Sequence, residues 1–253
     1  MQSIDLNCDM GEAFGQYQMS KDEILMDYIS SANIACGFHA GDPGIMENTV
    51  KLAIQKGVAI GAHPGLPDLQ GFGRREMQIS PKEAYQLTLY QVGALNAFVA
   101  AANAKLHHVK PHGALYNMAA KNKGLAMAIA QAIYDLDPNL ILYALSGSEM
   151  VEAASTFGLS TASEVFADRS YQDDGTLTPR SQFNAMLTDE ADSIRQVLTM
   201  VKHQQVISVN GNIVPLRADT ICLHGDGTHA VEFAKAISET LKTEQINIQA
   251  VTL

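Results

Sequence analysis

The stretch NIACGFHAGD, residues 33–42, decides the fold. Its apolar run at 34–36 indicates a short buried strand, and the strand stops at His39, which small residues and an acid follow. Asp42 and Pro43 then predict a helix start, because Asp is a favoured N-cap residue and Pro a favoured first helical residue. The stretch therefore predicts a strand that leads through a polar turn into a helix. Asp42 has two open roles, helix cap or pocket residue.

The same order recurs along the chain, where short β-rich runs alternate with longer helical patterns. The predicted strands are SIDLNC, ANIAC, VAIGA, HHV, LILYAL, STASEVF, QVISV and TICLH. Strands separated by crossover helices imply a mainly parallel sheet with helices outside it. About seven or eight such units, without a long linker, favour a single β/α-barrel domain over residues 1–253. A doubly wound open sheet is the alternative.

Three features interrupt this alternation. The segments 63–79 and 167–188 are long loops, and loops of that length in a compact domain are usually functional or mobile. Asn210-Gly211 between apolar runs predicts a hairpin.

Composition narrows the class of protein. The 253 residues are 47% hydrophobic and 17% charged, with a formal net charge of -10, so a large core is possible and binding to nucleic acid or anionic membranes is disfavoured. We expect a cytoplasmic protein, because the N-terminus shows no signal peptide and no run approaches the roughly 18 apolar residues of a membrane span. The three cysteines have no C-x-x-C spacing and indicate reduced, mostly buried thiols.

Chemically active side chains follow the predicted strands at the point where each strand ends. Four of the eight histidines occupy such places: His39, His63, His112 and His224. Lys110 comes directly after the fourth strand. In a parallel barrel the carboxyl ends of all strands meet at one face, where active sites lie. A lone histidine there is more often structural, but four at equivalent places favour a site.

Carboxylates follow the same rule. Asp5 and Asp9 flank Asn7 on the first strand, and alternation puts all three on one side, which could face the barrel axis. Further acids lie at or after later strands: Asp42, Asp68, Glu164, Asp168 and Asp226. Convergent imidazoles and carboxylates supply the general acid and base of hydrolysis or acyl transfer, and Lys110 could stabilise an oxyanion.

Cofactor signals are weaker. His39 and His63, with Asp9 or Asp42, could form a mixed N/O site for zinc or another divalent ion, yet no short H-x-H or H-x-x-x-H pair supports it. The chain contains no G-x-x-x-x-G-K-[ST] loop for ATP. Arg74 and the arginine after it could bind an anionic substrate group or salt-bridge to the acidic surface.

Six blocks, in this order and spacing, resemble the LamB/YcsF family, which supplies one of the subunits of bacterial ATP-dependent 5-oxoprolinases. The blocks are DLNCDMGEAFG, NIACGFHAGD, GAHPGLPDLQGFGRR, VKPHGALYN, SEVFADRSYQDDGTLTPR and ICLHGDGTHAV, and the match runs from about residue 3 to 250. The resemblance implies a barrel like those of the glycoside hydrolase/deacetylase superfamily. It also implies ATP as co-substrate, 5-oxo-L-proline as substrate, and two partner proteins, the B and C subunits.

On this resemblance, residues are expected in two roles. The expected catalytic residues are His39, His112, Asp168, Lys110, Glu164 and Asp9. The expected substrate-binding residues are His63, Asp42, Arg74, Arg169, Arg180, His224 and Asp226. Two other functions stay open: a stand-alone metal-dependent amidohydrolase or deacetylase, and a non-catalytic substrate-binding component of a complex.

Overall fold

Strand β1 (Ser3–Met10) alternates between two environments, and this alternation organises the barrel. Leu6, Cys8 and Met10 are fully buried among apolar side chains of the surrounding core. Asn7 points the other way and contacts Thr220 and Asn33, which lie on the two neighbouring strands. The predicted inward direction of the polar residues of this strand is therefore confirmed.

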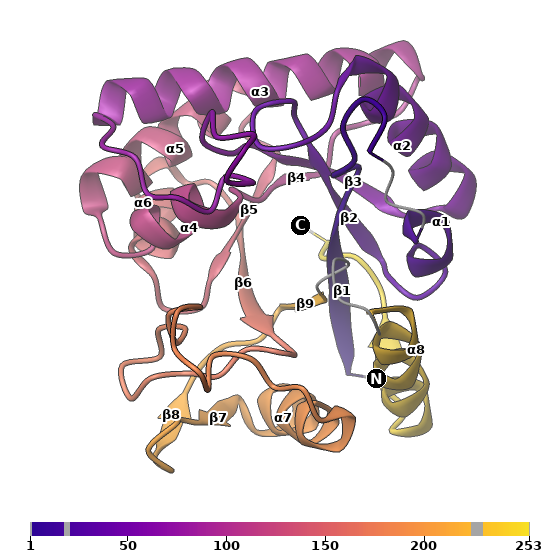
Figure 1. The fold of residues 1–253 in the computed structure, drawn as a ribbon, viewed down its shortest axis with the longest axis vertical. Helices are drawn as coiled ribbons and strands as arrows, with labels where there is room; N and C mark the ends of the chain where they lie inside the picture. The colour runs from indigo at the N-terminus through magenta and orange to yellow at the C-terminus, as the bar shows by residue number, and fades with distance from the viewer. Residues whose placement is uncertain (1, 18–20, 224–229, 253) are drawn as a thin grey trace.

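The computed structural model describes residues 2–17, 21–223 and 230–252, and in these it forms a closed parallel barrel with helices outside it (Figure 1). The barrel strands are β1 (Ser3–Met10), β2 (Ser31–Ala35), β3 (Ala59–His63), β4 (His108–Val109), β5 (Ile141–Leu145), β6 (Thr161–Phe166) and β9 (Thr220–Leu223). They pair in that order, and β9 closes the barrel by pairing with β1 in parallel. The predicted barrel is confirmed, with seven strands in the closed ring.

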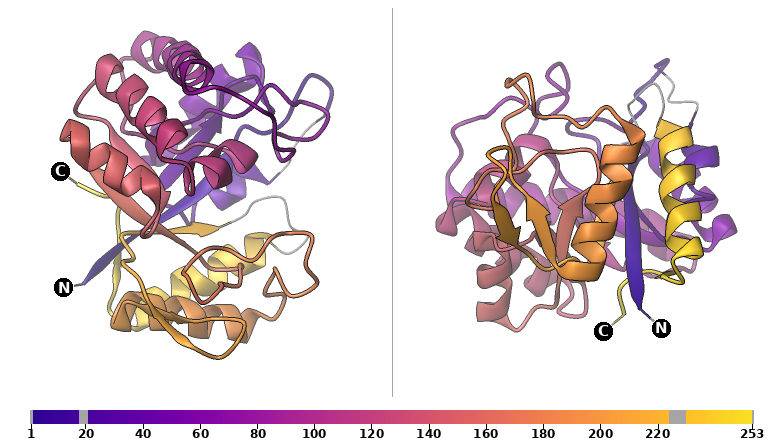
Figure 2. Two further views of the ribbon diagram at one scale, coloured as in Figure 1. Left: turned by 90° about the vertical axis from the view of Figure 1, so that its left-hand side faces the viewer. Right: turned by 90° about the horizontal axis from the view of Figure 1, so that it is seen from below.

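Helices cover the outside of this ring (Figure 2). They are α1 (Asp22–Leu25), α2 (Pro43–Lys56), α3 (Pro81–Ala101), α4 (Gly113–Ala119), α5 (Lys123–Leu136), α6 (Glu149–Phe157), α7 (Glu190–His203) and α8 (Ala230–Thr243). A short strand, β10 (Asn247–Ile248), adds to the start of β1 in parallel. Within the described ranges, no helix is both long enough and apolar enough to cross a membrane.

The run QVISV is not a barrel strand. Its first part forms β7 (Gln205–Ile207), which pairs with β8 (Ile213–Pro215) in an antiparallel hairpin, as Asn210-Gly211 predicts. Gly211 has φ of 83°, a left-handed conformation that glycine adopts without strain. The hairpin therefore lies in the connection between β6 and β9 and leaves the parallel ring to seven strands.

Helix α2 begins as the sequence indicates. The Asp42 carboxylate accepts hydrogen bonds from the backbone N–H groups of Gly44 and Ile45, at 2.9 and 3.0 Å. Gly57 ends the helix with φ of 69°. The cap at Asp42 sets where the turn between β2 and α2 ends. His39 lies in this turn, just after the end of β2.

Candidate functional site

A cavity of about 410 Å³ opens at the carboxyl ends of the barrel strands. The strands and the loops after them supply its polar wall, which contains Asp9, His63, Arg74, Lys110, His112, Arg169 and Arg180. Its volume falls in the roughly 300–1,000 Å³ range of small-molecule sites. Tyr116, Leu145 and Phe166 add apolar or aromatic surface.

Lys110 lies at the floor of this cavity, with 3% of its surface exposed. Its ammonium lies 3.0 Å from Asp9 Oδ1 and 2.8 Å from Glu164 Oε1, and it donates a hydrogen bond to Asn7 Oδ1 at 3.1 Å. Burial by itself lowers the pKa of Lys110, but the nearby carboxylates outweigh it and raise that pKa well above its ordinary value. Lys110 is therefore a fixed positive charge at the pocket floor.

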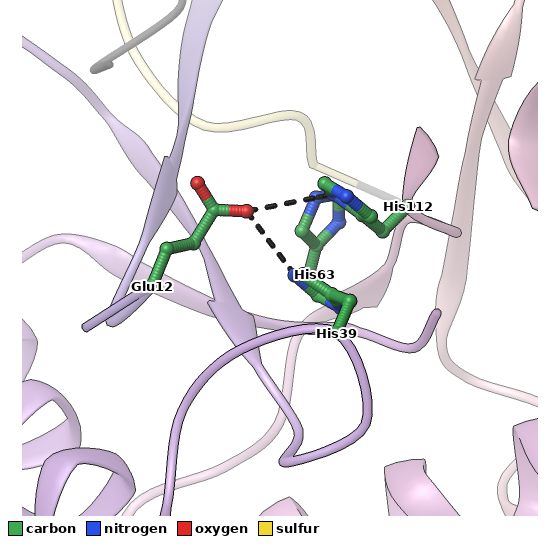
Figure 3. A group of neighbouring side chains, drawn as sticks. All are labelled: Glu12, His39, His63 and His112. Atoms are coloured by element: carbon green, nitrogen blue, oxygen red, sulfur yellow. Dashed lines mark hydrogen bonds and ion pairs between the residues drawn. The ribbon is translucent and has the colours of Figure 1, made fainter. Parts of the chain in front are cut away.

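Three imidazoles and a carboxylate gather beside this lysine (Figure 3). The rings of His39 and His112 stack face to face, with centroids 3.6 Å apart and planes inclined by 3°. His39 Nε2 lies 3.1 Å from Glu12 Oε1, and His112 Nδ1 lies 2.9 Å from His63 Nε2. We call these four residues the Glu12 cluster. It borders the pocket through His63 and His112.

Backbone carbonyls orient two of these rings. His63 Nδ1 lies 2.6 Å from the carbonyl oxygen of Lys110, and His112 Nε2 lies 2.7 Å from that of Phe72. Because a carbonyl can only accept, we assign a ring hydrogen to each of these nitrogens. His63 Nε2 and His112 Nδ1 then present lone pairs to the interior of the cluster.

Burial keeps the stacked rings neutral. It lowers the pKa of His112 to about 3, with a further contribution from the neighbouring His63 imidazole. It also holds the pKa of His39 well below its ordinary value, helped by the two neighbouring imidazoles. Neutral imidazole is the form that binds metals and accepts protons.

The loop after β1, residues 11–17, carries Glu12, and we call it the Glu12 loop. Hydrogen bonds to several parts of the chain hold it in place. Asp42 Oδ2 accepts a hydrogen bond from the Gly15 N–H at 3.0 Å, and Gly41 N–H donates to the Ala13 carbonyl at 2.8 Å. The Asp22 carboxylate accepts from the Gly11 N–H at 2.8 Å. The start of α2 and the turn after β2 therefore help to hold Glu12 against the imidazoles.

Arginines supply further positive charge to the pocket wall. Arg169 is only 4% exposed and donates to the carbonyl oxygens of Ala185 and Thr178, at 3.2 and 2.6 Å. Burial, then the charge of Arg180, lowers its pKa to about 10, so it stays charged at neutral pH. Arg74 packs its guanidinium over the Phe72 ring, 5.0 Å from the centroid.

The structure brings most of the expected site residues together. The cavity is lined by Asp9, His63, Arg74, Lys110, His112, Arg169 and Arg180. Glu164 lies behind Lys110 as its ion-pair partner, and His39 lies behind His112 in the stack. His224 and Asp226 lie outside the described residues.

Besides His39 and Glu164, two further expected residues, Asp42 and Asp168, do not line the pocket. Asp42 was expected to bind substrate, but its carboxylate is occupied by N–H groups of α2 and of the Glu12 loop, so it acts as a cap. Asp168 was expected to be catalytic; it is not among the residues that line this cavity, and its charge raises the pKa of Arg169 and partly offsets burial. Its backbone carbonyl accepts a hydrogen bond from Leu187 N–H at 2.8 Å.

Glu12 was not among the expected site residues. It follows the end of β1 inside the block DLNCDMGEAFG, where no strand or helix periodicity gives its direction. The expected metal ligands were His39 and His63 with Asp9 or Asp42. The structure keeps the two histidines, adds Glu12 and His112, and uses Asp42 elsewhere.

Comparisons with known proteins show the family of the chain and agree with its fold. The family model described as LamB/YcsF family matches residues 4–253. The A-type 5-oxoprolinase subunit of Brevibacillus brevis is 58% identical over 250 residues, which cover 99% of this chain and 98% of the relative. The crystal structure of the lactam utilization protein from Thermus thermophilus superposes with a TM-score of 0.93 at 45% identity, covering 99% of this chain and 100% of the other.

A more distant likeness concerns the fold alone. The catalytic domain of peptidoglycan N-acetylglucosamine deacetylase from Eubacterium rectale superposes with a TM-score of 0.53 at 10% identity. The match covers 99% of this chain and 89% of that one. The expected likeness to deacetylase barrels is thus found at the level of architecture.

Proposed function

The chain belongs to the LamB/YcsF family, and on this premise we propose that it is the A-type component of an ATP-dependent 5-oxoprolinase. Such an enzyme opens the lactam ring of 5-oxo-L-proline to give L-glutamate, with ATP hydrolysed to ADP and phosphate. The names of the relatives, which align along almost their full length, and the name of the Thermus thermophilus protein support the assignment. Its partners would be two further proteins, the B and C subunits.

The observation that carries the proposal is the charge arrangement of the pocket. The ammonium of Lys110 and the guanidinium groups of three arginines line one small cavity. Lys110 is placed to stabilise negative charge that develops on a carbonyl oxygen. Arg74, Arg169 and Arg180 suit a substrate carboxylate or a phosphoryl group. The cavity therefore fits a small anionic lactam better than a neutral or cationic ligand.

The chemistry explains the need for ATP. A five-membered lactam is an unstrained, resonance-stabilised amide, so water alone opens it slowly. Transfer of the γ-phosphoryl group to the lactam oxygen releases ADP and makes the ring carbon electrophilic. Water then adds to that carbon, the ring C–N bond breaks, and the nitrogen takes up a proton. The resulting acyl phosphate is hydrolysed by a second water to glutamate and phosphate.

Within this scheme the residues take separate roles. Lys110 would hold the lactam oxygen or its phosphoryl group, and the arginines would hold the anionic groups. The Glu12 cluster would orient the attacking water where His63 and His112 border the cavity. Asp9 and Glu164 would act by keeping Lys110 charged and in place.

The test is glutamate release from 5-oxoproline and ATP, measured with this chain alone and with the B and C subunits added. Release that requires ATP and is lost in Lys110→Met supports the proposal. Glutamate release without ATP, sensitive to chelators, would instead indicate the stand-alone metal-dependent amidohydrolase, which the Glu12 cluster favours as the second candidate. Full turnover by a complex that contains folded Lys110→Met would indicate a non-catalytic binding component.

A further inference from the structure

Four potential ligand atoms converge beside the pocket floor. They are one carboxylate oxygen of Glu12 and one ring nitrogen each of His39, His63 and His112, and all lie within 4.8 Å of one another (Figure 3). We propose that these four residues bind one divalent metal ion of the zinc class. The proposal concerns binding by this chain alone and does not rest on the proposed function.

The spacing of these atoms suits a common ion. Two atoms bound to one zinc ion at about 2.0–2.1 Å in tetrahedral geometry lie roughly 3.3 Å apart. Glu12 Oε1 lies 3.1 Å from His39 Nε2 and 3.5 Å from His112 Nδ1. His112 Nδ1 lies 2.9 Å from His63 Nε2. These separations are close to those of ligands that already share an ion.

The hydrogen assignment shows that a cation is needed there. The carbonyls of Lys110 and Phe72 accept hydrogen bonds from the ring N–H groups of His63 and His112. The other ring nitrogens of these two histidines face each other and therefore both carry lone pairs. Asp9 Oδ2 also approaches His63 Nε2, at 3.2 Å. Acceptors at such distances repel unless a metal ion or a proton lies between them. Carbonyls that fix imidazole ligands in this way are typical of metal sites.

The rings are also held in position before any ion arrives. A Cβ at Gly73 would lie 2.7 Å from both His112 Cδ2 and His39 Cβ, so the glycine backbone packs directly on the stacked pair. His39, His63 and His112 are between 0% and 3% exposed. Buried side chains that are already held in place lose little conformational entropy when they bind a metal.

The ligand chemistry selects the class of ion. Three imidazoles and one carboxylate suit zinc and its first-row neighbours, whereas calcium and magnesium prefer oxygen ligands alone. Four protein ligands fill the coordination sphere of a tetrahedral ion, so only expansion to five-coordination would let it bind a water and lower its pKa, or polarise a carbonyl oxygen.

The experiment is metal binding by the isolated full chain. Protein stripped with a chelator is dialysed against Zn²⁺, and bound zinc is measured by mass spectrometry. Co²⁺ is then titrated, since its visible absorption reports a tetrahedral site with nitrogen ligands. We expect one ion per chain, and a Co²⁺ spectrum that zinc abolishes by competition.

Variants assign the ion to the cluster. Loss of an outer-shell partner costs about 10–100-fold in affinity, so His112→Ala should weaken zinc binding by more than about 100-fold. Glu12→Gln keeps the side-chain shape and should weaken binding and change the Co²⁺ spectrum even if His112→Ala does not fold. His203→Ala, which removes an exposed imidazole at the end of α7, is the control and should bind like the unaltered chain.

Two results would overturn the proposal. If the folded, unaltered chain retains no stoichiometric zinc or cobalt, the cluster holds only a proton shared between His63 and His112. If Glu12→Gln and His112→Ala bind metal as tightly as His203→Ala, the ion lies elsewhere. Neither result depends on whether glutamate is released, so failure of this proposal and failure of the proposed function can be told apart.

Discussion

The ammonium of Lys110 lies 2.8 Å from Oε1 of Glu164, and both side chains are buried inside the barrel. The pair joins the end of β4 to β6 across the polar interior. Asp9 on β1 contacts the same ammonium at 3.0 Å, so one lysine balances two carboxylates. Removal of the lysine would leave the buried Glu164 and the partly buried Asp9 without their cation.

Lys110→Met should therefore lower the free energy of unfolding by about 3–5 kcal/mol, the usual cost of breaking a buried ion pair. The double variant Lys110→Met/Glu164→Gln should recover part of this loss, because it also removes one uncompensated charge. Urea denaturation followed by circular dichroism measures both. Lys51→Met removes an exposed partner of Glu47 and should change stability by less than about 1 kcal/mol. A loss in Lys110→Met as small as in this control would contradict the account.

A second expectation concerns Gly61 on β3. Its register partner is His108 on β4, and a Cβ at Gly61 would lie 2.0 Å from His108 Nε2. Gly61→Ala should thus destabilise the fold by about 1–3 kcal/mol or more, because the buried ring cannot move freely. Gly93→Ala in α3 meets no atom within 4 Å and should stabilise by up to about 1 kcal/mol. Thermal and urea denaturation compare the two, and equal effects would show that His108 can move aside.

A third expectation is a pH dependence that arises from Asp5. Burial raises the pKa of this carboxyl above its ordinary value of 3.8, although hydroxyl groups of Ser30, Thr220 and Ser31 donate to it. The folded state then binds the Asp5 proton more tightly than the unfolded state does. The contribution of Asp5 to stability is fully present below the unfolded pKa and is lost as pH rises through the folded pKa.

Asp5→Asn removes this titration. The difference in unfolding free energy between Asp5→Asn and the unaltered chain should therefore shift in favour of the variant as pH rises from about 4 to about 7. Urea denaturation at a series of pH values measures it. Glu232→Gln, which changes a carboxylate in the first turn of α8, serves as the control. Stability curves of Asp5→Asn that run parallel to those of the unaltered chain would rule out the effect.

The sequence predicts the barrel well because its signals are local. Alternation on β1, the cap at Asp42 and the hairpin glycine at Gly211 each depend on neighbours in the chain. The convergence of His39, His63 and His112 follows from parallel strands, whose carboxyl ends meet at one face. These features can be predicted from local sequence once the parallel barrel is assumed.

The remaining features of the site depend on contacts between distant loops. Glu12 meets His39 because the loop after β1 is held by Asp42 and Asp22, and no periodicity encodes that contact. The Phe72 carbonyl that orients His112 comes from the long loop after β3. The sequence leaves two roles open for Asp42, helix cap and pocket residue. The hydrogen bond from the Gly15 N–H, which comes from a distant loop, shows that the second carboxylate oxygen of Asp42 is also occupied.

The adjacent residues Arg74 and Arg75 give a matched pair for the last prediction. The sequence leaves both open between anion binding and surface salt bridges. In the structure Arg74 lines the pocket, whereas Arg75 is not among the lining residues. Arg75 instead pairs with Asp68, and its Nε lies 3.0 Å from Asp68 Oδ1. The two side chains have the same charge and differ in direction, so replacing each by Gln separates pocket contact from general electrostatics.

If Arg74 binds an anionic group of substrate, Arg74→Gln removes a charge-assisted hydrogen bond worth about 1.5–3 kcal/mol and should raise a KM by about 10- to 100-fold with kcat little changed. Steady-state kinetics of the assembled enzyme measure KM for each substrate. A rise for 5-oxoproline would assign Arg74 to the lactam carboxylate, and a rise for ATP would assign it to a phosphoryl group. Arg75→Gln should leave both constants within about twofold, since Arg75 contacts Asp68 and not the cavity. Equal changes in the two variants would mean that Arg74 acts only through long-range charge, and its place in the pocket wall would then carry no binding role.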